Sequence, residues 1–281
     1  MPPVLIETDV PEQAYRREAL TVGARDYIVR PFDIREFLAR VHNMLEVWQA
    51  HQIVKYQKDI LEIKVQERTK ELREAHDELQ DSRLEVVWRL GRAAEYRDNE
   101  TGLHIIRMSH YSRIIAEKVS SDKLWSDLIF NTAPMHDVGK IGIPDKIILK
   151  PGKLNDDEWT IMKKHCEYGA EIIGDHNSRV LQMAKEIALT HHEKWDGSGY
   201  PYGLSGNNIP ITGRIIALAD VFDALTSERP YKSAWSVDKA VDLIVDHAGR
   251  HFDPDLVMVF KDVLSDLLIY KNKYAESTVS K

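Results

Sequence analysis

Residues 105–116 read IIRMSHYSRIIA, and this stretch indicates the fold class of the longest part of the chain. Apolar and small side chains recur there every three or four positions, on one face of a helix: Ile105, Met108, Ser109, Ser112, Ile115 and Ala116. The helical period continues through residues 91–270, where no convincing pair of strands is found. Asn155 with Glu158 predicts a capping box, Ser236 predicts an N-cap, and Asp253 before Pro254 predicts another helix start. We therefore predict that residues 91–270 form an all-α domain.

The first 45 residues follow a different pattern. Two short β-like runs, at 4–6 and 26–29, flank a helical stretch at 15–20, and Asp33 can cap a helix after Pro31. Strand, helix, strand and helix with short loops make up half of a doubly wound α/β domain. Residues 1–45 are therefore predicted to form a small α/β unit that is too short to close such a sheet.

The sequences VLIETD (4–9) and ALTVGARDYIVRPFDIREFLARVHNML (19–45) resemble the C-terminal part of a bacterial two-component receiver domain. Thr8 stands where that family has its switch hydroxyl, and Arg30 replaces its usual lysine before Pro-Phe. The acidic pair and the phospho-accepting aspartate of the family have no counterpart in this chain. The resemblance implies a truncated receiver, residues 1–45, that is not controlled by phosphorylation.

Residues 46–90 are polar and almost free of glycine and proline, which predicts a long helix. Val65, Leu72, Leu79 and Val86 repeat every seven residues, and Leu61 and Ala75 occupy the partner position of a coiled-coil seam. Polar side chains interrupt that seam at Arg68, Ser82 and Arg89. We expect a parallel two-stranded coiled coil that makes the protein a homodimer, and the alternative is a solvated connecting helix. Residues 271–281 are predicted to be a polar tail.

Composition excludes several classes of protein. The 281 residues carry 38 basic and 45 acidic side chains, so the formal net charge of −7 argues against a general nucleic-acid-binding surface. The single cysteine, Cys166, excludes a disulfide framework or a cysteine-rich zinc module and fits a reducing cytosol. No apolar run approaches the ~20 residues of a membrane span, and the start lacks the basic region of a signal peptide. We expect a cytoplasmic protein that binds neither membrane nor nucleic acid.

Histidine carries the chemical signal, because the chain has 12 and their neighbours differ. Glu100 and His104 are four apart at the expected start of a helix, so their side chains share a face. His136 and Asp137 offer a nitrogen and a carboxylate that could bridge two cations, and Gly139 leaves room for a ligand. We expect a helix here, on which His136 and Lys140 share a face and Asp137 and Lys140 share the next turn. The alternative for Asp137 and Lys140 is a buried ion pair.

Four further residues complete a candidate metal centre. His165 lies in an expected amphipathic helix, and adjacent imidazoles at His191 and His192 suit two different metals because neighbours on a helix point about 100° apart. Asp220 is a carboxylate among apolar residues, which is costly unless it is paired or binds a cation. The predicted ligands carry only nitrogen and oxygen donors, and they suit two or three divalent ions such as Fe, Mn, Ni or Zn. They are Glu100, His104, His136, Asp137, His165, His191, His192 and Asp220. We interpret the remaining histidines as surface or satisfied core residues: His42, His51, His76, His110, His176, His247 and His251.

Long motifs in this region resemble the HD-GYP phosphodiesterases, a branch of the HD metal-dependent phosphohydrolases. They are HDVGKIGIPD (136–145), ILKPGKL (148–154), HHEKWDGSGYPYGLSGNNIP (191–210) and RIIALADVFDALTSERPYK (214–232), with Gly199-Tyr200-Pro201 as the namesake triplet. The resemblance covers roughly residues 65–265 and implies an HD-type helical bundle.

The resemblance also implies an activity, namely hydrolysis of cyclic di-GMP to pGpG, and possibly to GMP, in bacterial second-messenger signalling. It places His136, Asp137 and Lys140 in catalysis, and it gives Lys140, Tyr200, Arg229 and Lys232 contacts with the substrate. Iron or manganese is the favoured metal, with nickel or zinc as alternatives. Two alternative functions stay open: hydrolysis of 3′,3′-cyclic GMP–AMP, and a weakly catalytic cyclic-dinucleotide sensor that docks other signalling proteins.

Overall fold

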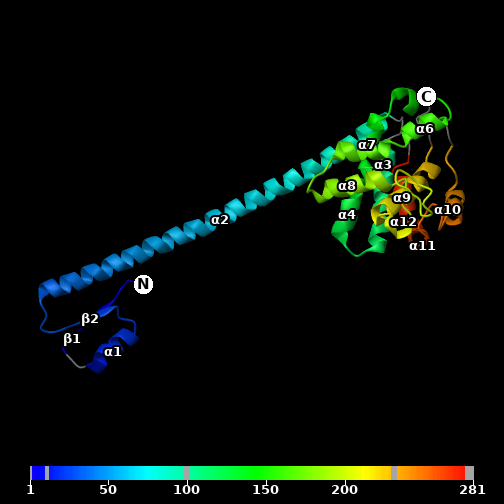
Figure 1. Ribbon diagram of the computed structural model, residues 1–281. Coiled ribbons are helices and arrows are strands. Elements are labelled where there is room, and N and C mark those ends of the chain that lie inside the picture. Colours follow the sequence, from blue (N-terminus) through cyan, green and yellow to red (C-terminus); the bar gives the residue numbers. More distant parts are fainter. Residues whose placement is uncertain (1, 10–12, 98–101, 229–232, 276–281) are drawn as a thin grey trace. The chain divides into compact units, whose positions relative to one another are not determined.

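The computed structural model describes residues 2–9, 13–97, 102–228 and 233–275. The chain divides into two compact units, Met1–Leu79 and Gln80–Lys281. The division falls within one helix, α2 (Ile34–Tyr96), which contributes residues to both units (Figure 1). The four-part domain division expected from the sequence stays a prediction.

The first unit contains the expected strand–helix–strand arrangement. Strands β1 (Leu5–Thr8) and β2 (Asp26–Val29) pair in parallel, with Leu5 opposite Asp26 and Thr8 opposite Val29, and α1 (Gln13–Thr21) connects them. The backbone N–H of Arg35 donates to Asp33 Oδ1 at 2.6 Å, so the expected cap at the start of the next helix is confirmed. The resemblance of this unit to a receiver stays a prediction.

Helix α2 includes the segment expected to be helical at 46–90, but it begins at Ile34. The reason is that the expected helix after Asp33 runs into the next one without a glycine or proline between Ile34 and Leu90. The apolar side chains of the expected seam are exposed in the single chain, Leu72 at 72% and Leu61 at 62%. Such exposure is what an unpartnered coiled-coil seam would show, and the dimer stays a prediction.

The second unit is helical, as expected. Its longer helices are α3 (Gly102–Val119), α4 (Lys123–Thr132), α7 (His165–Ile173), α8 (Arg179–Thr190), α9 (Ile211–Thr226), α10 (Val237–Asp246), α11 (Pro254–Asp262) and α12 (Leu264–Lys273). Short helices α5 (Asp145–Ile148) and α6 (Asp156–Met162), with 3₁₀ turns η1 (Ala133–Met135), η2 (Val138–Gly142) and η3 (Gly206–Asn208), lie between them. In its described residues this unit has no strand, only two isolated bridges.

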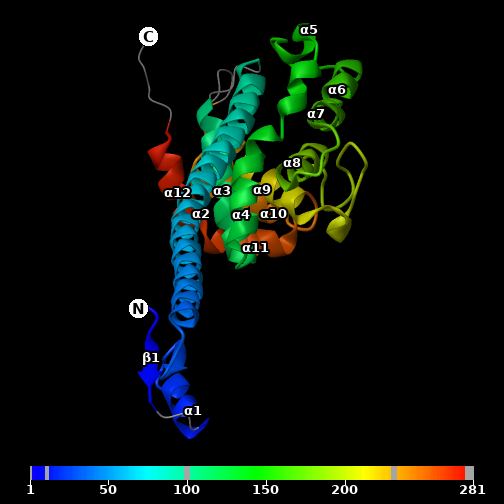
Figure 2. The same cartoon turned by 90° about the vertical axis from the view of Figure 1, so that its left-hand side faces the viewer.

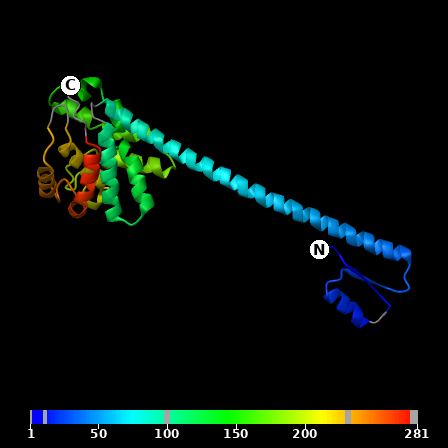
Figure 3. The same cartoon turned by 180° about the vertical axis from the view of Figure 1, so that it is seen from behind.

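The main core lies around α9. Helices α3, α8, α10 and α11 all contact α9 (Figure 2), and α12 lies beside α3 (Figure 3). Phe222 of α9 packs edge-on against Tyr111 of α3 and Phe260 of α11, and all three are fully buried. This packing fixes the two helices, α3 and α9, from which His104 and Asp220 project.

The predicted helix starts are confirmed. Asn155 and Glu158 form the capping box of α6, with each side chain accepting from the other residue's backbone N–H at 2.8 Å. Ser236 accepts from the backbone N–H of Lys239, and Asp253 caps α11 ahead of Pro254. Among the described residues, no helix is both long and apolar enough to cross a membrane.

Candidate metal centre

The candidate ligands come from five separate segments. His104 lies near the start of α3 and Asp220 lies in α9. His136 and Asp137 lie between η1 and η2, His165 is the first residue of α7, and His191 and His192 follow the last turn of α8. Most of these side chains therefore project from helix ends or 3₁₀ turns, where the backbone changes direction.

The prediction of a helix over residues 136–140 was wrong. Residues 138–142 form the 3₁₀ turn η2, and Asp137 leaves the helical region with φ −105° and ψ 12°. The cause is close packing of Gly139 on α7, because a Cβ at that position would fall on the backbone oxygen of His165 and the nitrogen of Gly169. The turn brings Asp137 against His165 and keeps Lys140 beside it, with Lys140 Nζ 2.9 Å from Asp137 Oδ2. The ion pair considered as an alternative is therefore present together with the cluster.

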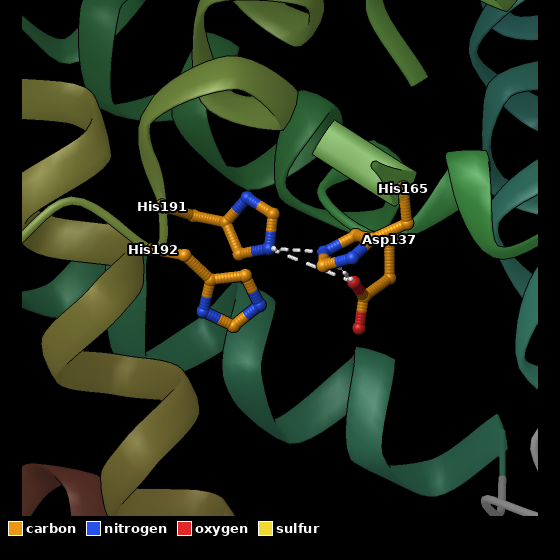
Figure 4. A group of neighbouring side chains, drawn as sticks. All are labelled: Asp137, His165, His191 and His192. Carbon is orange, nitrogen blue, oxygen red and sulfur yellow. Dashed lines mark hydrogen bonds and ion pairs between the residues drawn. The ribbon is translucent and has the colours of Figure 1, made fainter. Parts of the chain in front are cut away.

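One cluster consists of Asp137, His165, His191 and His192 (Figure 4), whose ligand atoms all lie within 4.8 Å of one another. Asp137 Oδ1 is 3.2 Å from His165 Nε2 and 3.5 Å from His191 Nε2, and these two nitrogens are 3.4 Å apart. Donor atoms held about 2.1 Å from one tetrahedral ion lie roughly 3.4 Å apart. The spacing therefore suits a cation at the centre of the three atoms.

A second cluster consists of His104, His136 and Asp220. His104 Nε2 lies 3.5 Å from Asp220 Oδ1. The two clusters meet at Asp137, because its other oxygen, Oδ2, is 3.2 Å from His136 Nε2. Seven of the eight predicted ligands are thus brought together, while Glu100 lies outside the described residues, as do the predicted substrate contacts Arg229 and Lys232.

Hydrogen bonds orient the imidazoles toward the clusters. The Nδ1 atoms of His136, His165 and His191 lie 2.8 to 3.0 Å from the backbone oxygens of Ala133, Met162 and Ile187. A carbonyl oxygen only accepts, so each Nδ1 carries the proton and each Nε2 has its lone pair free for a cation. This arrangement is typical of metal-binding histidines.

Burial and charge set the protonation of the site. Burial opposes ionisation of Asp137, but the charge of Lys140 together with the neighbouring imidazoles outweighs it, and the pKa of Asp137 lies well below its usual range. Burial lowers the pKa of His191 and, more strongly, that of His192, which keeps both rings neutral. Burial also disfavours the charged form of His136, but Asp137 outweighs it and raises that pKa.

Two buried polar atoms of the candidate metal centre have no hydrogen-bond partner among the described residues. Within the described part of the chain, His136 Nε2 and Asp137 Oδ1 are buried without a hydrogen-bond partner, and a buried polar atom left so is costly. A carboxylate and several imidazole lone pairs facing one another fit a divalent cation between them. The residues present therefore fit metal ions.

The Gly-Tyr-Pro loop covers one side of the clusters. The Tyr200 ring lies on His192, with ring centres 4.8 Å apart, and burial raises the pKa of its phenol. Gly199 has no space for a side chain, since a Cβ there would lie 2.6 Å from Glu193 Cα. Glu193 is itself buried, and its carboxylate accepts backbone N–H bonds from Tyr202 and Leu204 at 2.8 and 3.0 Å.

Three buried residues beside the clusters were missed by sequence reasoning. His104 Nδ1 donates to Asp223 Oδ2 at 2.8 Å, and the Arg107 guanidinium donates to both oxygens of Asp223 at 2.7 and 2.8 Å. Glu95 lies near the end of α2, with Oε1 3.6 Å from His104 Nε2. Asp223 lies three residues after Asp220 in the same apolar stretch, so the argument applied to Asp220 could have found it.

Cys166 adjoins the first cluster but is unsuited to bind metal. Its Sγ lies 3.5 Å from His165 Nε2, and burial raises the pKa of the thiol. Because the thiolate is the form that ligates metals, a protonated thiol is a poor ligand. A protonated Cys166 thiol agrees with the expectation that only nitrogen and oxygen atoms bind the metal ions.

Comparisons with known proteins agree with these features. A model of the HD domain family matches residues 55–256. The chain is 42% identical to the cyclic di-GMP phosphodiesterase response regulator RpfG of Xanthomonas campestris pv. campestris, over 91% of this chain and 66% of that protein. It is 37% identical to a cyclic di-GMP phosphodiesterase of Thermotoga maritima, over 98% of this chain and 75% of that protein. The chain thus spans just under two thirds of the Xanthomonas relative.

A solved structure has the same kind of fold. The crystal structure of a cyclic GMP-AMP specific phosphodiesterase of Vibrio cholerae, V-cGAP3, matches with a TM-score of 0.52 at 20% identity. The match covers 70% of this chain and 51% of that one. At that identity the likeness supports the HD-type helical fold and nothing finer.

Proposed function

Because this chain belongs to the HD domain family, and within it to the HD-GYP phosphodiesterases, we propose that it is a metal-dependent phosphodiesterase that hydrolyses cyclic di-GMP. The observation that carries the proposal is the set of imidazole Nε2 atoms directed at Asp137 while their Nδ1 atoms are tied to backbone oxygens. A binding protein for cyclic dinucleotides has no need of such a centre. The substrate is a bacterial second messenger, so we place the protein in the cytoplasm.

We assign the first cluster to one ion and the second cluster to another, with Asp137 shared between them. Neutral imidazoles and carboxylates suit iron or manganese, with nickel or zinc as alternatives. When bound, two such ions polarise the phosphodiester and lower the pKa of the attacking water. The chain contributes the ionised carboxylate of Asp137 and the neutral rings of His191 and His192, which are in the protonation states that metal binding requires.

Local cations explain how a chain of net charge −7 could bind a dianion. Lys140 is held beside the clusters by Asp137, and we propose that it stabilises charge on a phosphate oxygen. Tyr200 is proposed to form the wall of the substrate pocket, where its raised pKa keeps the phenol protonated. Arg229 and Lys232 are proposed to contact the second phosphate or a guanine. The first product would be pGpG, with GMP as a slower one.

The experiment compares the wild-type protein with His136→Ala/Asp137→Ala, purified anaerobically with Mn²⁺ or Fe²⁺. We expect the variant to lose bound metal and turnover of cyclic di-GMP, measured by elemental analysis and product chromatography. The matched control is His76→Ala/Asp77→Ala, which changes the same dipeptide on the exposed surface of α2. Unchanged hydrolysis in the first variant would refute the proposal.

Base preference is measured in the same assay. Rates on cyclic di-GMP and on 3′,3′-cyclic GMP–AMP are compared side by side. Cyclic di-GMP is the substrate named for the relatives that match more than nine tenths of this chain, so we expect the higher kcat/KM with it. A higher value with the mixed dinucleotide would reassign the substrate, and tight binding without any product would identify a sensor.

We further propose that α2 pairs with the same helix of a second copy. The seam contains Val65, Leu72, Leu79 and Val86, and its members are exposed in the single chain. Leu72→Glu/Leu79→Glu should give monomers by light scattering, because two charges would be buried in the seam. The control, Tyr56→Glu/Ile63→Glu, alters two exposed apolar residues on the opposite helix face and should leave a dimer. A dimer in both variants would place association elsewhere.

A further inference from the structure

Glu95 is a buried carboxylate next to the second cluster. It lies in the last turn of α2 with 3% of its surface exposed, and its neighbour Ala94 is also buried. Its Oε1 atom is 3.6 Å from His104 Nε2. Burying an ionised carboxylate costs several kcal/mol unless cations or hydrogen bonds compensate it, and the imidazole of His104 is one such group within reach of Glu95.

His104 presents a lone pair on the side that faces Glu95. Its Nδ1 lies 2.8 Å from Asp223 Oδ2, and the Arg107 guanidinium donates to both oxygens of that carboxylate at 2.7 and 2.8 Å, as it does to an ionised group. An ionised carboxylate only accepts, so the Nδ1 proton is committed to Asp223. In the neutral ring, Nε2 is then unprotonated and faces two carboxylate oxygens, Glu95 Oε1 at 3.6 Å and Asp220 Oδ1 at 3.5 Å.

We propose that Glu95 is a ligand of the ion held by His104 and Asp220. Both distances from His104 Nε2 are close to the roughly 3.4 Å that separates donors bound about 2.1 Å from one tetrahedral ion. With Glu95 added, the second site of His104, His136 and Asp220 would hold two carboxylates, whereas the first has three imidazoles around Asp137. The inference rests on the metal centre of the proposed function and adds one ligand to it.

The competing explanation is a plain ion pair between Glu95 and a protonated His104. Such a pair would produce the same 3.6 Å contact with no metal. The two explanations differ in metal affinity, because only a ligand is expected to change the number or the tightness of bound ions when its charge is removed. Metal binding therefore separates them without any use of enzyme activity.

The test titrates apo-protein with Mn²⁺ under anaerobic conditions, and bound ions are counted by elemental analysis and electron paramagnetic resonance. Wild-type protein should bind at least two ions per chain. Glu95→Gln should lose one of them or bind it at least 10-fold more weakly, as removal of supporting groups at metal sites costs about 10–100-fold. Glu95→Asp keeps the charge but withdraws it by one methylene, and it should give an intermediate affinity.

The control is Asp253→Asn, which makes the same amide replacement at another buried carboxylate of the unit. Asp253 pairs with Arg214 at 2.6 Å and caps α11, so its replacement should lower stability and leave the metal count unchanged. Glu95→Gln with wild-type stoichiometry and affinity would overturn the inference in favour of the ion pair. If Glu95→Gln fails to fold, an Mn²⁺ affinity of Glu95→Asp equal to wild type would do the same. Wild-type protein that binds the ions but cleaves no cyclic dinucleotide would refute the proposed function and leave the ligand assignment standing.

Discussion

Gly139→Ala tests whether close packing of η2 on α7 sets the metal centre. A Cβ at Gly139 would fall on the His165 backbone oxygen and lie 2.8 Å from the His165 carbonyl carbon. Packed carbon atoms lie roughly 3.5–4.0 Å apart, and the oxygen would be closer still than that carbon, so the two backbones must separate by more than about 1 Å. That shift acts on His165, whose Nε2 is 3.2 Å from Asp137 Oδ1, and would widen the first cluster.

The expected cost is on the order of 2 kcal/mol, because overpacking typically costs about 1–3 kcal/mol and outweighs the 0.5–1 kcal/mol or so that alanine gains over glycine. For a domain of roughly 200 residues this corresponds to a fall in melting temperature of about 4–8 °C. Metal affinity should fall as well, which equilibrium dialysis measures. Gly142→Ala is the matched control from the same turn, because its Cβ would meet the movable ring of Tyr168 at 2.8 Å. Wild-type stability and metal binding in Gly139→Ala would refute the reasoning.

Three further predictions concern polar groups that are buried or half-buried in the helical unit. Asp223→Asn should weaken metal binding about 10–100-fold in calorimetric titrations, because the bond that orients the neighbouring imidazole is lost. Glu193→Gln should lower the free energy of unfolding by about 1–3 kcal/mol in urea, since an amide cannot accept both backbone N–H bonds of the following loop. Burial lowers the pKa of His110 to about 4. The unfolded state therefore binds a proton below about pH 6.5, whereas the folded state binds it only near pH 4. Stability consequently falls as the pH falls through that range. His110→Phe keeps a ring against Tyr270 and should show a shallower loss of stability between pH 7 and pH 5; an equal slope in both proteins would contradict this origin.

Local sequence was sufficient for the helices and their starts. The spacing of apolar residues in α3 and the caps at Asn155, Ser236 and Asp253 depend on neighbours within a few positions, so one stretch at a time could be interpreted. The convergence of the histidines was predicted from the series as a whole, although His165 in its amphipathic stretch carried no local signal of a ligand. Their roles in catalysis, the receiver and the coiled coil stay predictions.

Contacts between distant segments could not be inferred in the same way. The turn at Gly139 replaces a helix because of α7, which follows it by more than twenty residues and packs against its backbone. The bond from Arg107 to Asp223 joins residues 116 apart, and no local pattern marks the pair. The amphipathic helix expected to contain His165 begins at that residue, because α6 ends at Met162 and residues 163–164 separate it from α7.

The state of Cys166 bears on how the protein should be handled. Its thiol is fully buried and its pKa is raised, and the reactive form of cysteine is the thiolate. Alkylating reagents should therefore leave the folded protein unlabelled. Because the chain has no other cysteine, loss of activity in air would not arise from an exposed thiol; with the metal centre proposed above, a reductant that restores activity would be acting on the bound ions.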